Sequence, residues 1–416
     1  MSTLLDLRPL RENRTFRRLW IGTTASGFGG QFGAFAGLFY VWQQTRSAAM
    51  LGLVGLAIGV PLIALALAGS AFADHVDRRR LAMRGTYAQI AVAVAMTAVA
   101  FTQSGGAGVA LMLALIAVQS GLGGLVAPAR HTFVAALLTG DRLAAGLALK
   151  HLSFQLAMLL GPAAAGAVTA TAGVAWCFGF DALTYVAALI GVAGLPSGTA
   201  PAPGRAGWGA VRAGLRYAAR TPAVRGALLA DLAATVFAMP VALFPVVNAE
   251  HFGDRPEILG LFTTALAVGG VTASVLSGPA TRHARPGVIL LACGGVWAAA
   301  LGAAGLTDGL ALMLALIAVA GAADTWAVVA RGTVVQTVTP DAYRGRISSL
   351  EHIVGSAGPQ LGNVRAGLVA GALSGSAALA IGGAAALLAT GALAATTPQL
   401  RRFRLTGQEA EPSLSP

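Results

Sequence analysis

Twelve apolar runs, each close to twenty residues long, recur along the whole chain and are separated by short charged stretches. They fall at residues 19–42, 50–73, 82–102, 107–129, 144–170, 173–195, 224–248, 257–278, 287–306, 309–330, 346–371 and 375–396. A helix needs about 20 mostly apolar residues to cross the hydrocarbon core of a bilayer. We therefore expect an all-α integral membrane protein with twelve transmembrane helices.

The composition agrees with this fold class and excludes others. Hydrophobic residues make up 56% of the chain and charged residues 11%, whereas a soluble domain carries roughly 25% charged residues. The net charge of +12 does not indicate nucleic-acid binding, because the basic residues lie between the apolar runs and do not form one soluble face. Cys177 and Cys293 both lie in apolar runs and the six histidines show no ligand spacing, so we predict no disulfide and no metal site.

The positions of lysine and arginine predict the orientation in the membrane. Alternate connecting segments, together with the two ends of the chain, hold 25 of the 28 basic residues, and the remaining connections hold two, Arg46 and Arg255. Basic residues are concentrated in cytoplasmic loops. We expect a multi-pass protein of the cytoplasmic (inner) cell membrane with both termini in the cytoplasm.

The runs form two sets of six around a segment rich in proline and arginine. The expected parts are a cytoplasmic N-terminal segment 1–18, a six-helix half 19–195, a cytoplasmic linker 196–221, a second half 222–397 and a cytoplasmic tail 398–416. Motifs recur about 200 residues apart, with Gly161-Pro162 matched by Gly358-Pro359 and Arg130 by Arg331. Such repeats are typical of transporters that were built by duplication of a six-helix unit.

A charged segment follows the second run and contains the first motif with a specific order. Its key residues are Ser70, Asp74, Asp77, Arg78, Arg79 and Arg80. The order resembles the loop between the second and third helices of the major facilitator superfamily, although His75 and Asp77 stand where that family usually has Arg and Gly. By composition alone the segment is equally a plain topology anchor.

Further motifs resemble one branch of that superfamily, the enterobactin-exporter-like transmembrane secretion effectors. They are Phe16-Arg-Arg-Leu-Trp20, Asp74 to Arg80, Gly161-Pro162, Ala284-Arg-Pro-Gly287, Pro340-Asp-Ala-Tyr-Arg-Gly-Arg346 and Leu400-Arg-Arg-Phe-Arg404. The resemblance implies that the Asp74–Arg80 motif latches the cytoplasmic side while the binding site faces outward. It also implies antiport for Gly161-Pro162, where proline and glycine let a helix bend; an ordinary structural kink is the alternative, here and at Gly358-Pro359.

Ionisable residues inside the runs are the candidates for coupling and binding, because a charge in lipid is costly unless it faces a cavity or a partner. We expect proton coupling at Asp231 first, with Asp181 and Asp324 as alternates. Arg331, Glu351 and Arg365 are the candidates for substrate contact or charge pairing, and Asp324 and Arg331 share one helix face. The alternative for Asp231 is a purely structural pairing with an adjacent helix.

These features together predict an exporter driven by the proton gradient, with no other cofactor and no enzyme activity. A small molecule and the lipid bilayer are the expected partners, nucleic acid is not, and we expect a monomer. A siderophore is the first candidate cargo, and macrolide or multidrug efflux is the alternative. A non-transporting sensor or scaffold with this fold and a nutrient importer stay open. The chain contains no Gly-x-x-x-x-Gly-Lys-Ser/Thr phosphate loop, which argues against ATP as the energy source.

Overall fold

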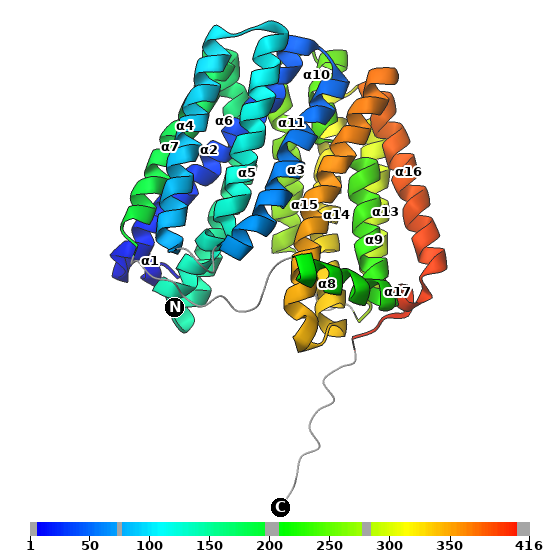
Figure 1. Ribbon diagram of the computed structural model, residues 1–416. Coiled ribbons are helices and arrows are strands. Elements are labelled where there is room, and N and C mark those ends of the chain that lie inside the picture. Colours follow the sequence, from blue (N-terminus) through cyan, green and yellow to red (C-terminus); the bar gives the residue numbers. More distant parts are fainter. Residues whose placement is uncertain (1–5, 73–76, 196–207, 277–283, 406–416) are drawn as a thin grey trace, which may run out of the picture.

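A computed structural model describes residues 6–72, 77–195, 208–276 and 284–405, and every regular element in them is a helix (Figure 1). The first half contains α1 Arg8–Glu12, α2 Arg14–Thr45, α3 Ala48–Phe72, α4 Arg78–Thr102, α5 Gly105–Leu137, α6 Asp141–Ala172 and α7 Val174–Ala193. The rest contains α8 Trp208–Arg220, α9 Pro222–Ala238, the 3₁₀ turn η1 Val241–Leu243, α10 Phe244–His251, α11 Pro256–Val275, α13 Pro286–Ala304, α14 Leu310–Val338, α15 Asp341–Ala372, α16 Gly375–Thr396 and α17 Pro398–Arg402.

Ten helical segments of the described chain are long and apolar enough to cross a membrane. Two more helices, α2 and α15, have 32 residues each, which gives about 48 Å at 1.5 Å per residue, but they are more polar. They run beside the other ten in the same bundle (Figure 1). The expected all-helical membrane fold is confirmed, and the arrangement is consistent with twelve spans.

Several helices begin or end at residues whose chemistry sets the boundary. Asn13 accepts a hydrogen bond from the Phe16 amide at the start of α2, and Asp77 does the same for the Arg80 amide at the start of α4, both at 2.9 Å. These side chains satisfy amides that have no partner within the helix. Gly173, with φ of 98°, separates α6 from α7, in a conformation that glycine adopts without a steric penalty.

The bundle has two ends, which differ in content. We call the end that carries α1, α8 and α17 the terminal face, and the opposite end, with the turns at 46–47, 252–255 and 373–374, the loop face (Figure 1). The linker helix α8 is attached to the second half at the terminal face. Its Tyr217 hydroxyl donates to the Val338 carbonyl at 3.0 Å, and its ring stacks on Tyr343 with centroids 4.8 Å apart.

The two halves meet along two helix pairs, α3 with α15 and α6 with α11. Glycines allow both contacts, since small residues let helix backbones approach closely in membranes. A Cβ at Gly260 of α11 would lie 2.5 Å from the Pro162 carbonyl oxygen of α6, and one at Gly52 of α3 would lie 3.2 Å from Val364 Cα of α15. All these contacts lie in the part of the bundle nearest the loop face.

The seventh apolar run, predicted as one span over 224–248, is interrupted in the structure. Helix α9 ends at Ala238, and η1 and α10 follow as separate elements. Pro240 explains the break, because proline has no N–H and forces the residue before it into extended conformation; Met239 has φ −72° and ψ 120°. The Asn363 side chain accepts a hydrogen bond from the Ala242 amide at 3.2 Å. By contrast, α6 and α15 continue as single helices through Pro162 and Pro359.

Candidate functional site

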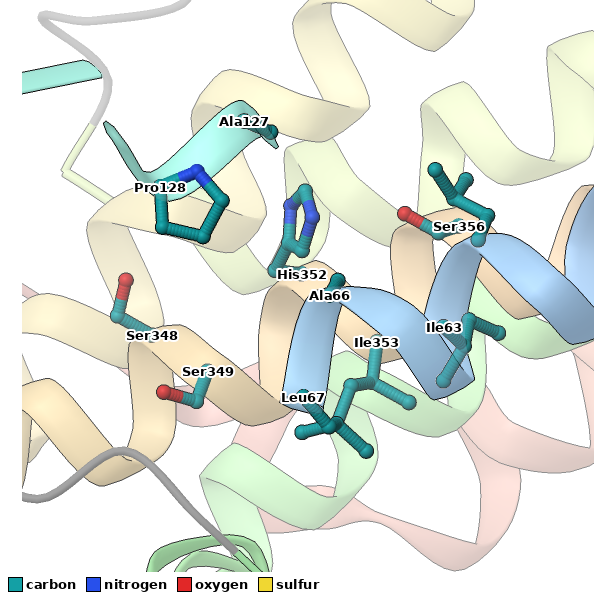
Figure 2. A pocket seen from close by; sticks show the side chains of 11 residues that line it. Ile63, Ala66, Leu67, Ala127, Pro128, Ser348, Ser349, His352, Ile353 and Ser356 are labelled. Atoms are coloured by element: carbon teal, nitrogen blue, oxygen red, sulfur yellow. The ribbon is translucent and has the colours of Figure 1, made fainter. Parts of the chain in front are cut away.

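A cavity of about 320 Å³ lies between α3, α5 and α15, toward the terminal face (Figure 2). Its two long walls differ in chemistry. Helix α3 contributes the apolar side chains Leu62, Ile63, Ala66 and Leu67, and α15 contributes Ser348, Ser349, His352, Ile353 and Ser356. A cavity with an apolar wall and a hydroxyl- and imidazole-bearing wall suits an amphipathic small molecule.

The same two helices close off this cavity on the side of the loop face. A Cβ at Gly59 of α3 would lie 2.9 Å from the Gln360 side chain of α15, and one at Gly55 would lie 3.1 Å from Asn363. Gly59 and Gly55 are one and two turns beyond Leu62 along α3. The two halves therefore touch toward the loop face and are separated by a cavity toward the terminal face.

The predicted gate motif is described only in part. Asp74 lies outside the described residues, and Ser70 belongs to α3. Asp77 caps α4, while the Arg79 guanidinium donates to the Ala193 carbonyl at the end of α7 at 2.6 Å. Arg78 is buried and Arg80 is exposed. In the described part of the motif, Asp77 thus caps the start of its own helix, and the Arg79 hydrogen bond joins the start of α4 to the end of α7.

Charged residues of the second half gather around one arginine. Arg331 of α14 forms an ion pair with Asp231 of α9, and each side chain is 12% exposed. Asp324, about two turns along α14, and Glu351 of α15 are both within electrostatic range of this pair. The structure thus brings together four of the sequence-predicted residues, with three carboxylates around one guanidinium. We name this set the acidic cluster. Arg331 pairs with a neighbouring helix, and not with Asp324 on its own face.

Asp181 of α7 is placed alone in the first half. It is 4% exposed, and its Oδ1 atom has no hydrogen-bond partner in the described part of the chain. The carboxylate lies against the glycine face of α2: a Cβ at Gly33 would lie 2.7 Å from Oδ2, and one at Gly29 would lie 2.8 Å from Oδ1. The absence of side chains at these glycines makes the space that the carboxylate occupies.

The first half contains a polar network whose residues were not among the candidates predicted from the sequence. The Arg130 guanidinium of α5 donates to Thr86 Oγ1 at 2.8 Å and to Gln89 Oε1 at 3.0 Å on α4, and Gln89 donates to the Tyr185 hydroxyl at 3.5 Å. Tyr185 is one turn from Asp181 on α7. The available signal in the sequence was a set of four polar residues inside or at the end of three apolar spans, two of which, Thr86 and Gln89, are three residues apart on one helix face.

The repeated Gly-Pro motifs occupy matching places in the two halves. Gly161 of α6 packs against Gln31 of α2, where a Cβ would lie 2.6 Å from Gln31 Cβ. Gly358 of α15 packs against Thr235 of α9, with the corresponding Cβ distance at 3.4 Å. In each half the fifth long helix therefore approaches the first through the glycine of the motif, as a duplicated unit requires.

Arg365 is separate from the acidic cluster. It lies 14 residues, or about 21 Å, beyond Glu351 along α15, next to Gly382 of α16, where a Cβ would be 2.7 Å from Arg365 Nη2. Its Nε and Nη2 atoms are buried without a hydrogen-bond partner among the described residues. The predicted pairing candidates Glu351 and Arg365 therefore do not meet.

The described helices form two groups that meet along two helix pairs, with a cavity between them and charges within the spans, an arrangement typical of secondary transporters. The chain belongs to the transmembrane secretion effector family of the major facilitator superfamily, which matches residues 5–414. It is a multi-pass membrane transporter for small molecules and not an enzyme.

Two related proteins agree with this assignment. The chain is 28% identical over 367 residues to the multidrug efflux pump Tap of Mycolicibacterium fortuitum, covering 84% of this chain and 87% of the pump. It is 25% identical over 410 residues to the enterobactin exporter EntS of Escherichia coli, covering 97% of each. Both relatives are exporters, which supports an exporter of the same superfamily here.

Solved structures share the fold at lower sequence identity. A bacterial homologue of the iron transporter ferroportin in its inward-facing state has a TM-score of 0.71 at 14% identity, over 92% of this chain and 98% of that one. A bacterial homologue of the lysosomal transporter Spinster has a TM-score of 0.66 at 15% identity, over 96% and 99%.

Proposed function

We propose that the protein is a proton-coupled exporter of an amphipathic small molecule that works by alternating access, with a siderophore as the first candidate cargo. The observation that carries the proposal is the relation between α3 and α15: glycines join them toward the loop face, and a cavity separates them toward the terminal face. A pair of halves that is closed on one side and open on the other is one of the two states that alternating access requires.

The terminal face is proposed to be cytoplasmic, so that the cavity faces the source of the cargo. The support is the distribution of basic residues: among the described residues, 23 of 26 lie on segments of this face and in the adjoining ends of the spans. The moving units are proposed to be residues 19–195 and 222–397, with 196–221 as the linker. Helix α8 packs on the second half, so this part of the linker would move with that half.

Proton coupling is proposed at the acidic cluster. One guanidinium offsets one of its three carboxylates, so the cluster carries excess negative charge in a low-dielectric setting, where charge is costly. Uptake of a proton would remove part of that cost, and a proton gradient would then bias which state the halves adopt. Asp231 remains the first candidate because its ion pair with Arg331 must change strength when the carboxylate is protonated. Asp181 and Asp324 are the alternates.

The test uses purified protein in liposomes with the terminal face outward. The imposed proton gradient has its acidic side in the lumen, which corresponds to the outside of the cell. We expect uphill uptake of iron-free enterobactin, the cargo named for one relative, or of erythromycin, and we expect Asp231→Asn to abolish uphill uptake while downhill exchange persists. Asp341→Asn, which alters an exposed acid paired with Arg344 at the start of α15, is the matched control and should transport normally.

Each possible result separates the alternatives. Uptake of erythromycin without enterobactin would make the protein a drug exporter, which the name of the Tap relative and the apolar α3 wall of the cavity also favour. Accumulation of a probe in the lumen only when the bath is the acidic side would mean that probe and proton move in the same direction, which would indicate an importer. Absence of flux of either probe, with exchange also absent, would favour the sensor or scaffold. If Asp231→Asn transports uphill with a normal dependence on pH, Asp231 does not couple the proton.

A further inference from the structure

A second recess, of about 300 Å³, lies between α2, α5 and α6 within the first half. Ala127 of α5 lines both this recess and the cavity of Figure 2, so the two adjoin. The recess also has room at its glycines. A Cβ at Gly123 would meet nothing within 4 Å, and one at Gly27 would meet its first neighbour at 3.8 Å. The recess is therefore an extension of the proposed transport cavity into the first half.

The chemistry of the recess is that of a cation-lined site. Among the described residues that line it, the charged ones are Arg130 and Lys150, the chain's single lysine, and no acid is among them. The described hydrogen-bond partners of the Arg130 guanidinium, Thr86 and Gln89, are both neutral. The Arg130 guanidinium, at this depth in a span, needs an anionic partner or water, because its desolvation is not offset by neutral acceptors alone.

The repeat offers an internal comparison for Arg130. Arg331 stands at the matching position of the second half, 201 residues later, and the protein neutralises it with Asp231. No described acid lies within ion-pair distance of Arg130. The same structural position is thus neutralised by the chain in one half and bordered by an open recess in the other.

We propose that this recess binds an oxyanion, the carboxylate or similar acidic group of the cargo, with Arg130 and Lys150 as its charge contacts. The proposal deepens the proposed function, and rests on it in taking the anion to be part of the cargo. An anionic lipid headgroup has the same chemistry and is the other possible source of the oxyanion. The apolar wall of the adjoining cavity would hold the hydrophobic part of an acidic cargo.

The test compares two probes of the same shape, 2-naphthoate and 2-naphthamide. The first carries a carboxylate and the second a neutral amide. Binding is measured by calorimetry on the whole protein in nanodiscs of phosphatidylcholine, without any gradient. We expect wild type to bind the carboxylate about tenfold or more tightly than the amide, as hydrogen bonds to charged groups imply. Arg130→Gln and Lys150→Gln should each remove most of this preference. Arg142→Gln, which alters an exposed arginine paired with Glu12, should keep it.

A further variant and a second lipid complete the design. Gly123→Leu keeps both cations and fills the recess, so it should weaken binding of the carboxylate even if Arg130→Gln does not fold. Weaker 2-naphthoate binding in nanodiscs of phosphatidylglycerol would assign the oxyanion to lipid and overturn the cargo assignment. Equal binding of the two probes by wild type, or an unchanged preference in both charge variants, overturns the site itself. Because the readout needs no transport, failure of export would count against the proposed function and not against this site.

Discussion

The indole N–H of Trp42 donates a hydrogen bond of 2.9 Å to Asp254 Oδ1 and so joins α2 of the first half to the α10–α11 turn of the second. The other carboxylate oxygen of Asp254 forms an ion pair with Arg46, which follows α2. Asp254 has φ of 59°, a conformation that few residues other than glycine adopt. These three residues, which we call the loop-face latch, connect the halves on the side where they are closed.

The first prediction concerns this latch. Asp254→Asn keeps an acceptor for Trp42 and removes the ion pair with Arg46. The pair is partly exposed, at 23% for Asp254 and 55% for Arg46, so its loss should shift the balance between states by at most about 1 kcal/mol, or about fivefold. The assay places a cysteine at position 30 in place of Gly30 and adds a membrane-impermeant maleimide from the loop-face side. We expect Asp254→Asn to raise the labelling rate of this cysteine by up to about fivefold.

Gly30 suits this assay because a Cβ there meets nothing within 4 Å. The background would carry Cys177→Ser and Cys293→Ser, both of which replace buried free cysteines. Arg46→Gln should reproduce the effect of Asp254→Asn. Arg142→Gln, at the terminal face, should not. Unchanged labelling in both latch variants would mean that the latch does not hold the halves together.

The second prediction concerns the stability of the Asp231–Arg331 pair. Both side chains are 12% exposed, and removal of one member of a buried pair costs about 3–5 kcal/mol when the other charge is left uncompensated. That condition holds for Arg331→Gln, which leaves three carboxylates without a cation. Asp231→Asn should cost less, because Asp324 and Glu351 remain within electrostatic range of Arg331. Asp231→Asn and Arg331→Gln should each lower the melting temperature in detergent clearly, and the double variant should lose less than the sum of the two. Strictly additive losses would show that the pair is not coupled. Asp341→Asn is again the exposed control.

The sequence was sufficient to predict features that depend on local composition and repetition. The spans, the all-helical fold and the family follow from apolar runs near twenty residues long and from motifs such as Gly161-Pro162. The interruption at Pro240 was not predicted, because a proline alone does not decide whether a helix ends: α6 and α15 continue through Pro162 and Pro359. It lay inside a run apolar enough to pass as one span.

The partners of the charged residues were not predictable in the same way. Asp324 and Arg331 share a face of one helix, yet Arg331 pairs with Asp231, which is 100 residues away in the sequence. The packing between helices decides which charged residues pair, and the spacing of residues along one helix does not show which helices will be neighbours. Gly29, Gly33 and Gly37 recur every four residues along α2, a spacing that indicates a face for close helix packing. That Asp181 occupies this face could be seen only once α7 was placed beside α2.

The third prediction uses two glycines of α2 that differ in what they face. Gly33→Ala places a methyl group 2.7 Å from Asp181 Oδ2, so the buried carboxylate must move. We expect a loss of about 1–3 kcal/mol in stability from overpacking, read as a lower melting temperature, together with reduced transport. Gly30→Ala, three residues away and facing open space, should instead gain up to about 1 kcal/mol from better helix propensity. A Gly33→Ala variant as stable as Gly30→Ala would mean that the carboxylate has room to turn away.

The last prediction asks whether packing or charge holds the loop face closed. A Cβ at Gly260 of α11 would lie 2.5 Å from the Pro162 carbonyl oxygen and 3.1 Å from Ala163 Cα of α6. These are backbone atoms, which cannot rotate away as a side chain can. Gly260→Ala should therefore disfavour the state in which the two helices touch. Overpacking costs about 1–3 kcal/mol, which corresponds to a shift of about 5- to 150-fold in the balance between states.

We expect Gly260→Ala to raise the labelling rate of the cysteine at position 30 more than Asp254→Asn does, because the contact it disrupts is tightly packed and the ion pair of the latch is partly solvated. Gly295→Ala is the matched control on α13, where a Cβ meets nothing within 4 Å, and it should label like wild type. If Asp254→Asn has the larger effect, the closed state depends on the latch more than on the contact between α6 and α11. If neither variant changes the labelling, the loop face is held closed by the remaining contact, between α3 and α15.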